Sequence, residues 1–253
     1  MLESNVTDPL RGFFITGTDT GVGKTVVTAG LLRGLRARGI DAIPMKPVQT
    51  GALSTPDGLR APDLEFCLSA AGICPSPDER ALMAPYLYEP ACSPHLAGRL
   101  CGRYADIGWV RECARRLGRA HECLLVEGAG GVMAPLDDER TMLALMRALG
   151  LPVLLVARAT LGTINHTLLS LGALRETGLR VLGVVVNHVV EAARDFIIED
   201  NLKAIAQFGG LPVLGEVRHM KRVAAGGGST EAWRAFESDM IGLRVILNEL
   251  KDR

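Results

Sequence analysis

Short apolar runs alternate with longer segments of helical periodicity along most of the chain. Six apolar runs predict strands at residues 13–16, 42–45, 123–127, 153–157, 181–187 and 213–216. Most of these runs are apolar throughout rather than alternating, which is typical of strands covered on both faces of a parallel sheet. Helices are predicted between them at residues 24–38, 62–71, 107–119, 141–149, 163–177 and 191–208. The pattern predicts an α/β fold, a doubly wound and mostly parallel sheet with helices on both faces and ligands at the carboxyl ends of its strands.

The remaining segments predict loops and one terminal helix. Residues 51–58 and 74–78 are rich in Ser, Thr, Pro and Gly and are predicted to be loops. Residues 226–228 are all glycine and predict a flexible joint. Near 230–250 an amphipathic helix is expected, with an apolar face formed by Trp233, Phe236, Met240, Leu243, Leu247 and Leu250. Its polar face is not basic, which favours packing on the body or on a dimer partner over a membrane surface. We expect residues 1–253 to form one domain.

Composition excludes several classes of partner. The 253 residues are 48% hydrophobic, enough for one large core, and Lys+Arg and Asp+Glu both number 28. With no net charge, the protein has no overall electrostatic attraction to nucleic acid or to an acidic membrane, so small molecules are the expected partners. Six cysteines lack any Cys-x-x-Cys pair, which argues against zinc and disulfides and favours reduced, mostly buried thiols. We also expect no signal peptide and no membrane span, and therefore a cytoplasmic protein.

The first chemical motif follows the first predicted strand. Residues 17–25 read Gly-Thr-Asp-Thr-Gly-Val-Gly-Lys-Thr, which is the layout of a phosphate-binding loop between a strand and a helix. Backbone N–H groups of the loop and of the helix start form an anion site. Lys24 is expected to reach the outer phosphates of a nucleotide, and Thr25 a bound Mg²⁺. The loop is one residue longer than the strict pattern, because position 18 is threonine and the first glycine is Gly17.

Two further candidates follow strands directly. Lys46 precedes Pro47 at the end of the second predicted strand, where its ammonium would point into the phosphate crevice; a solvated surface lysine is an equally good interpretation from spacing alone. Glu127 ends an apolar strand and enters the glycine-rich turn 128–131, as a Mg²⁺-binding carboxylate does in phosphate-loop enzymes. A capping or solvent-facing acid is the alternative for Glu127.

Two signals are weaker. The segment 160–166 reads Thr-Leu-Gly-Thr-Ile-Asn-His and opens a helix after a strand, so its free N–H groups could hold a carboxylate. Thr and Asn are also ordinary helix-capping residues, which leaves this interpretation open. Asp63 follows Pro62 at a helix start, where it either complements the helix dipole or acts as a second metal carboxylate.

Together these motifs resemble dethiobiotin synthetases. The resemblance rests on residues 17–25, on Lys-Pro-Val-Gln-Thr-Gly at 46–51, on Glu-Pro-x-x-Ser-Pro-His at 89–95, and on the turn 127–131 and segment 161–166. The motifs occur in the family's order and extend from about residue 12 to Glu216. The resemblance implies a phosphate-loop enzyme that closes the ureido ring of dethiobiotin from 7,8-diaminononanoate, CO₂ and ATP. It also implies Mg²⁺ as cofactor and a homodimer.

The resemblance assigns roles residue by residue. It implies that Lys46 and Lys24 are catalytic and that Thr25, Asp63 and Glu127 surround the metal. The implied ATP-binding residues are Gly21, Val22, Gly23, Lys24, Thr25, Val26, Asp63, Glu127, Gly128, Ala129, Gly130, Asn187, His188 and Arg218. The implied substrate contacts are Thr20 and Thr50, and Gly162, Thr163 and Asn165 from across the dimer interface.

The chain departs from the family pattern after Glu216. Arg218 stands where relatives commonly have a proline near the expected adenine edge. One hypothesis is an altered base pocket, in which Arg218 stacks on the ring or nucleotide selectivity is looser. A solvated basic turn is the other interpretation.

Other classes of function use similar loops. Partner-binding ATPase switches carry an extra lysine at the start of the loop, and residues 16–19 contain none. An amide-forming ligase of cofactor biosynthesis would be expected to need a glutaminase domain, for which no length remains. Both stay as alternatives to the synthetase.

Overall fold

The computed structural model describes residues 9–191, 196–220, 230–240 and 242–251. Its centre is a parallel sheet with strand order β10-β9-β8-β1-β7-β2. The strands are β1 (Gly12–Gly17), β2 (Ala42–Met45), β7 (Cys123–Glu127), β8 (Val153–Arg158), β9 (Val181–Asn187) and β10 (Val213–Val217). Each of these strands was predicted from its apolar run, with ends that differ by at most one residue. The predicted doubly wound parallel sheet is therefore confirmed.

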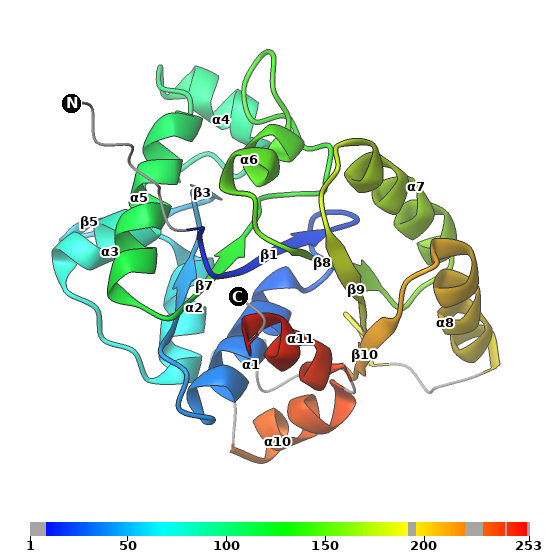
Figure 1. Cartoon of the computed structure of the whole chain (residues 1–253). Helices are drawn as coiled ribbons and strands as arrows, with labels where there is room; N and C mark the ends of the chain where they lie inside the picture. Colours follow the sequence, from blue (N-terminus) through cyan, green and yellow to red (C-terminus); the bar gives the residue numbers. More distant parts are fainter. Residues whose placement is uncertain (1–8, 192–195, 221–229, 241, 252–253) are drawn as a thin grey trace, which may run out of the picture.

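Helices cover both faces of the sheet (Figure 1). One face carries four of the predicted helices, namely α5 (Ile107–Ala120), α6 (Met142–Leu149), α7 (Thr163–Glu176) and α8 (Phe196–Gly209). The other face carries α1 (Lys24–Arg36), α10 (Thr230–Asp239) and α11 (Leu243–Lys251), and α2 (Pro62–Ala71) packs beside α1. The first residues predicted for α8 include 192–195, which lie outside the described residues.

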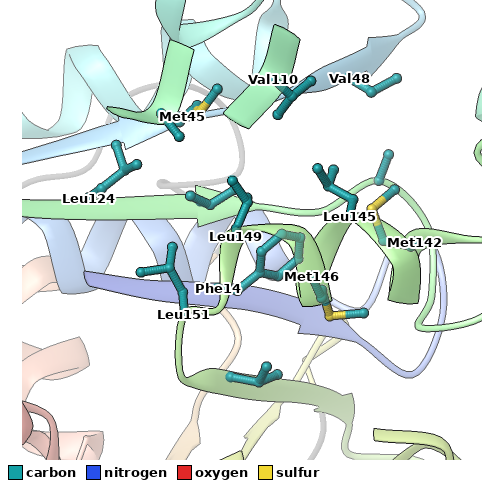
Figure 2. Close-up of a cluster of buried hydrophobic side chains, with 14 of the residues drawn as sticks. Phe14, Met45, Val48, Val110, Leu124, Met142, Leu145, Met146, Leu149 and Leu151 are labelled. Carbon is teal, nitrogen blue, oxygen red and sulfur yellow. The ribbon is translucent and has the colours of Figure 1, made fainter. Parts of the chain in front are cut away.

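The side chains of β1 point alternately into two apolar cores, one on each face of the sheet. Phe13 and Ile15 point into the core that contains α1, α10 and α11, whereas Phe14 belongs to the core under α5 and α6. Figure 2 shows Phe14 among side chains of α6, including Met146 and Leu149. Burial on both faces explains why the strand sequences are apolar throughout.

Several short elements were not predicted. They are β3 (Val48–Thr50), β4 (Leu53–Thr55), β5 (Gly58–Arg60), α3 (Pro77–Met83), β6 (Tyr86–Tyr88) and α4 (Pro94–Leu100). The loop predicted at 51–58 was wrong in part, because β4 and β5 form an antiparallel hairpin there. The loop predicted at 74–78 ends early, since the Ser76 hydroxyl accepts the Glu79 N–H at 3.2 Å and caps α3.

The C-terminal region differs from the single helix predicted for it. It forms α10 and α11, and between them the Gly242 N–H donates to Leu214 O at 2.7 Å. A Cβ on Gly242 would lie 2.5 Å from Leu214 Cδ2, so the junction fits β10 only without a side chain. Trp233 and Phe236 are buried against the body, as expected for packing there. The glycines at 226–228 lie outside the described residues.

Two remaining expectations concern cysteines and membranes. Three of the six cysteines, Cys67, Cys113 and Cys123, are buried, while Cys74 and Cys101 are exposed, so "mostly buried" was too strong. Among the described residues, no helix combines the length and apolarity that crossing a membrane requires.

Candidate active site

The phosphate loop occupies residues 18–23, between the end of β1 and the start of α1. Gly21 has φ 73° and Gly23 has φ 96°, which lie in the left-handed region that favours glycine. Gly23 is also the N-cap residue of α1, so the loop leads directly into the unpaired N–H groups at the start of this helix. The buried Lys24 turns back over the loop and donates from Nζ to Asp19 O at 2.9 Å. The predicted strand, glycine-rich loop and helix are all present.

Beside this loop, one lysine and two carboxylates meet where β2, β7 and α2 converge. Lys46 Nζ lies 2.6 Å from Glu127 Oε1 and 2.7 Å from Asp63 Oδ2. It also donates to Gly128 O at 3.2 Å, and only 4% of the residue is exposed. The Thr25 hydroxyl donates to the same Glu127 oxygen at 2.9 Å. Lys46 is therefore a buried member of the cluster, which excludes the interpretation of a solvated surface lysine.

The two lysines of the site differ in their electrostatics. Burial would lower the pKa of Lys46, but the carboxylates of Glu127 and Asp63 outweigh it and raise this pKa above its usual value. Burial, together with the nearby Lys46 ammonium, lowers the pKa of Lys24 to about 8. Burial would raise the pKa of Asp63, and Lys46 more than offsets it, so the carboxyl stays below its usual range. Lys46 is thus held as a cation, whereas the pKa of Lys24 lies closer to neutrality, although Glu127, Asp63 and Asp19 oppose the shift.

These residues line one cleft of about 1040 Å³. One wall carries the phosphate loop with Lys24, Thr25, Lys46, Asp63 and Glu127. Thr20 and Thr50 line it as well. The rest of the lining comes mainly from residues 91–94, from residues 129–134 and from three side chains of α7, namely His166, Leu169 and Ser170.

The donor set fits a magnesium ion. Asp63 and Glu127 provide carboxylate oxygens and Thr25 a hydroxyl oxygen, all within the reach of one Lys46 ammonium. Hard oxygen donors are what Mg²⁺ prefers, and it usually takes one or two carboxylates with water and substrate phosphates completing its shell.

Comparison with known proteins adds the family. The model of the AAA_26 family, an AAA domain, matches residues 11–225. The chain is 43% identical over 215 residues to the ATP-dependent dethiobiotin synthetase BioD of Anaeromyxobacter sp. (strain Fw109-5), covering 85% of this chain and 93% of the relative. It is 38% identical to the protein of the same name from Anoxybacillus flavithermus (strain DSM 21510 / WK1), covering 83% and 93%.

The chain belongs to the dethiobiotin synthetase family. Solved structures with a similar fold include a chain of the MinC:MinD cell division protein complex of Aquifex aeolicus, with a TM-score of 0.57, 14% identity and coverage of 96% and 94%. The septum site-determining protein MinD of Pyrococcus horikoshii OT3, complexed with Mg-ADP, also gives 0.57, with 17% identity and coverage of 96% and 95%. At such low identity these likenesses show the fold alone. They agree with the predicted phosphate-loop hydrolase-like architecture.

Six residues that the dethiobiotin synthetase resemblance assigns to ATP do not line the cleft, namely Val22, Val26, Gly128, Asn187, His188 and Arg218. The last three are held by other parts of the chain. The Asn187 amide donates from Nδ2 to Val22 O at 3.0 Å. His188 is buried and its Nε2 lies 2.9 Å from Glu216 Oε1. Arg218 is held by both carboxylate oxygens of Asp239, at distances from 2.6 to 3.1 Å. Base stacking by Arg218 stays a prediction, and it would have to compete with this ion pair.

The residues at the start of α7 differ in whether they line the cleft. Gly162, Thr163 and Asn165 do not line the cleft, and Asn165 is exposed to solvent. His166 and Ser170, which sequence reasoning did not assign, do line it. Their spacing of four, with Leu169 between them, places them on one helix face, so periodicity offered a signal that could have found them.

Sequence reasoning also missed Gln49 and Ser93, which line the cleft. The Gln49 amide accepts the Asp63 N–H at 3.3 Å and donates to Thr50 O at 2.8 Å, and thereby joins the Lys46 motif to the start of α2. The Ser93 hydroxyl lies 3.0 Å from His95 Nδ1. Both residues occur inside motifs that carried the resemblance, and only the fold shows that they face the same cleft.

Proposed function

We propose that this protein is an ATP-dependent dethiobiotin synthetase of biotin biosynthesis, which closes the ureido ring of dethiobiotin from 7,8-diaminononanoate and CO₂ and releases ADP and phosphate. The observation that carries the proposal is the Lys46, Glu127, Asp63 and Thr25 cluster beside the phosphate loop in one cleft. The relatives of this activity, matched over most of their length, support it.

The first step forms a carbamate. A neutral amine of the substrate attacks CO₂: a C–N bond forms, one C=O π bond opens to give the carbamate oxygen, and the nitrogen releases its proton to water. The carbamate and the triphosphate are both anionic and repel each other. Lys46 and Lys24 both line the cleft, and their positive charge would offset that repulsion, as preorganised charges do in other enzymes.

The second step activates the carbamate, and the third closes the ring. A carbamate oxygen attacks the γ-phosphorus in line with the leaving oxygen, and ADP departs; holding the two groups in register is most of the catalytic task. The second amine then attacks the carbonyl carbon of the mixed anhydride: the second C–N bond forms, the C–O bond to phosphate breaks, and the proton of the attacking amine leaves with the phosphate. No protein nucleophile is required. Burial, with the charge of Glu127, raises the pKa of the Cys67 thiol well above its usual value and keeps this nearby cysteine protonated.

We assign the metal to Thr25, Asp63 and Glu127. When bound, Mg²⁺ supplies positive charge to the phosphoryl oxygens. We assign the nucleotide to the following residues: Gly21, Val22, Gly23, Lys24, Thr25, Val26, Asp63, Glu127, Gly128, Ala129, Gly130, Asn187, His188 and Arg218. Lys24 supports this assignment because its ammonium already lies over the loop.

We further propose that the protein acts as a homodimer. Thr20 and Thr50 line the cleft and would contact the diamine end of the substrate. Gly162, Thr163 and Asn165 do not line the cleft of their own protomer, which is what a site that serves the partner's cleft requires. There the N–H groups at the start of α7 would bind the distant carboxylate of the substrate. The cytoplasmic location expected from the sequence remains part of this proposal.

One assay tests the reaction. Purified protein is incubated with ATP, Mg²⁺, bicarbonate and 7,8-diaminononanoate, and phosphate and dethiobiotin are measured, the latter by mass spectrometry. We expect one phosphate per dethiobiotin and no ADP formation when the diamine is omitted. ATP hydrolysis that continues without the diamine, with no dethiobiotin formed, would contradict the proposal and favour an ATPase switch.

A further inference from the structure

Asp19 lies in the part of the phosphate loop that is one residue longer than the strict pattern, and it makes three separate contacts there. Its Oδ1 accepts the Thr20 N–H at 2.7 Å, and its carbonyl oxygen accepts from Lys24 Nζ at 2.9 Å. Its Oδ2 accepts from Arg158 at 2.5 Å. The residue therefore holds the loop, the phosphate-binding lysine and a side chain from another strand at once.

Arg158 is the last residue of β8, at the point where the chain leaves the sheet toward α7. Its side chain is 35% exposed, and that of Asp19 is 54% exposed. The Arg158 Nε is buried and has no hydrogen-bond partner among the described residues. The contact with Asp19 is thus what orients this guanidinium. Because both partners are partly in water, the pair contributes little to folding, and its effect is on position.

A second connection joins the same two regions through Asn187. The side chain of Asn187 donates to Val22 O in the phosphate loop at 3.0 Å, and its carbonyl oxygen accepts the Ala159 N–H at 3.0 Å. Gly23 fits against this amide only because it lacks a side chain, since a Cβ there would lie 2.0 Å from Asn187 Nδ2. Residues 158 and 159 are therefore tied to both halves of the loop.

The chain beyond residue 159 builds the other side of the site. It opens α7, whose His166, Leu169 and Ser170 line the same cleft as the phosphate loop. Lys24 and Arg158 both donate hydrogen bonds to Asp19. A phosphate that binds Lys24 therefore changes the contacts of Asp19, and through Asp19 it affects the position of Arg158. We propose that the Asp19–Arg158 pair is a brace between the phosphate loop and the entrance to α7, so that nucleotide binding and diamine binding strengthen each other. Arg158 is then a positioning residue for both substrates. This inference rests on the proposed function for the identity of the second ligand.

Calorimetry on the full chain measures the coupling directly. The affinity for 7,8-diaminononanoate is determined with and without Mg²⁺ and a non-hydrolysable ATP analogue. We expect the analogue to tighten diamine binding by about fivefold or more in the unaltered protein, and the diamine to tighten analogue binding by the same factor. In R158Q and in D19N each ligand alone still binds, while the coupling falls to about onefold. The double variant D19N/R158Q should lose no more than either single variant, because the two residues act through one contact.

Arg36→Gln is the matched control. Arg36 pairs with Asp41 at 3.0 Å with side chains 36% and 45% exposed, away from the cleft, so this variant should keep the full coupling. R158K should recover part of it, because a lysine can still reach the carboxylate but lacks the planar fork of arginine. Full coupling retained in R158Q and D19N, or no coupling in the unaltered protein, would overturn the inference. Dethiobiotin formation by the unaltered protein is measured separately, so failure of the brace is distinguished from failure of the proposed function.

Discussion

Lys46 is the residue on which the charge balance of the site depends. Replacing it by alanine should lower the rate of ring closure by about 10²- to 10³-fold, as for other preorganised charges. The substitution also removes the cation that is paired directly with Glu127 and Asp63, so we expect a loss of about 3 kcal/mol of folding stability when Mg²⁺ is absent. Steady-state assays and thermal unfolding in EDTA and in Mg²⁺ measure the two effects.

Two comparisons make the Lys46→Ala experiment informative. Mg²⁺ should recover more stability in the variant than in the unaltered protein, because both carboxylates then face the metal instead of the ammonium. Lys203→Ala, at an exposed position of α8, should change neither rate nor stability. Near-normal turnover in Lys46→Ala would show that the ammonium has no catalytic role.

Gly23 is a second residue whose role can be isolated. Gly23→Ala should weaken ATP binding, because the new Cβ would lie 2.0 Å from Asn187 Nδ2 and would push this amide away from the loop. Gly39→Ala is the control, since Gly39 has φ 82° and no described atom lies within 4 Å of the place that a Cβ would take there. Both substitutions place alanine at a positive φ, which costs about 1 kcal/mol in either case. Only Gly23→Ala should raise the KM for ATP, and an equal KM in both variants would contradict the role given to this packing.

Residues next to strand ends were predictable from sequence, whereas residues that act through distant partners were not. Lys46 and Glu127 each follow an apolar run directly, so the rule that ligands lie at carboxyl ends of strands found both. From spacing alone, Lys46 was equally consistent with a site residue and a surface residue. Its burial beside two carboxylates excludes the surface interpretation, and its catalytic role stays a prediction. Arg158 also ends a strand, but its partner lies 139 positions away, and no local pattern reports that contact.

At the scale of elements, the C-terminal helices depend on a close fit with α1. Gly30→Ala should destabilise the protein by about 1 to 3 kcal/mol, because a Cβ there would lie 2.4 Å from the Phe236 ring. Gly34→Ala, one turn further along α1, meets no described atom closer than 3.7 Å and should stabilise the helix by about 0.5 to 1 kcal/mol. Urea unfolding gives both values. Equal effects of the two substitutions would show that α10 does not dock on α1 as described.

Long elements were predictable and short ones were not. The strands of the main sheet and α1 each provide enough apolar or periodic residues to be recognised. The three-residue strands β3 and β6 are too short for any period to show, and they exist because they pair with each other. The break between α10 and α11 was missed because the apolar spacing continues across it from Met240 to Leu243. The hydrogen bond from Gly242 to Leu214, a contact far apart in sequence, marks the interruption.

At the scale of the whole molecule, fold and function carry separate information. The same architecture occurs in the MinC:MinD chain at 14% identity and in MinD at 17% identity, so the sheet and the helices do not distinguish a synthetase from a cell division protein. The family is shown instead by the relatives at 38% and 43% identity, and the proposed chemistry rests on the site, where Lys46 bridges Glu127 and Asp63. If the α7 residues serve a partner, the site is incomplete within one protomer, which makes the dimer a testable part of the function.

Mixing two inactive variants tests whether the site is shared between protomers. Lys46→Ala removes the ammonium from the cleft but leaves the start of α7 intact. Asn165→Asp places a negative charge at that exposed helix start, where it should repel the substrate carboxylate, and leaves Lys46 intact. If each site takes Lys46 from one protomer and the α7 amides from the other, a mixed dimer contains one complete site. Random reassociation of equal amounts should then restore about a quarter of the normal activity, as a two-fold symmetric dimer requires. Activity that stays at the sum of the two variants, although size-exclusion chromatography shows dimers exchanging subunits, would place the carboxylate site within a single protomer.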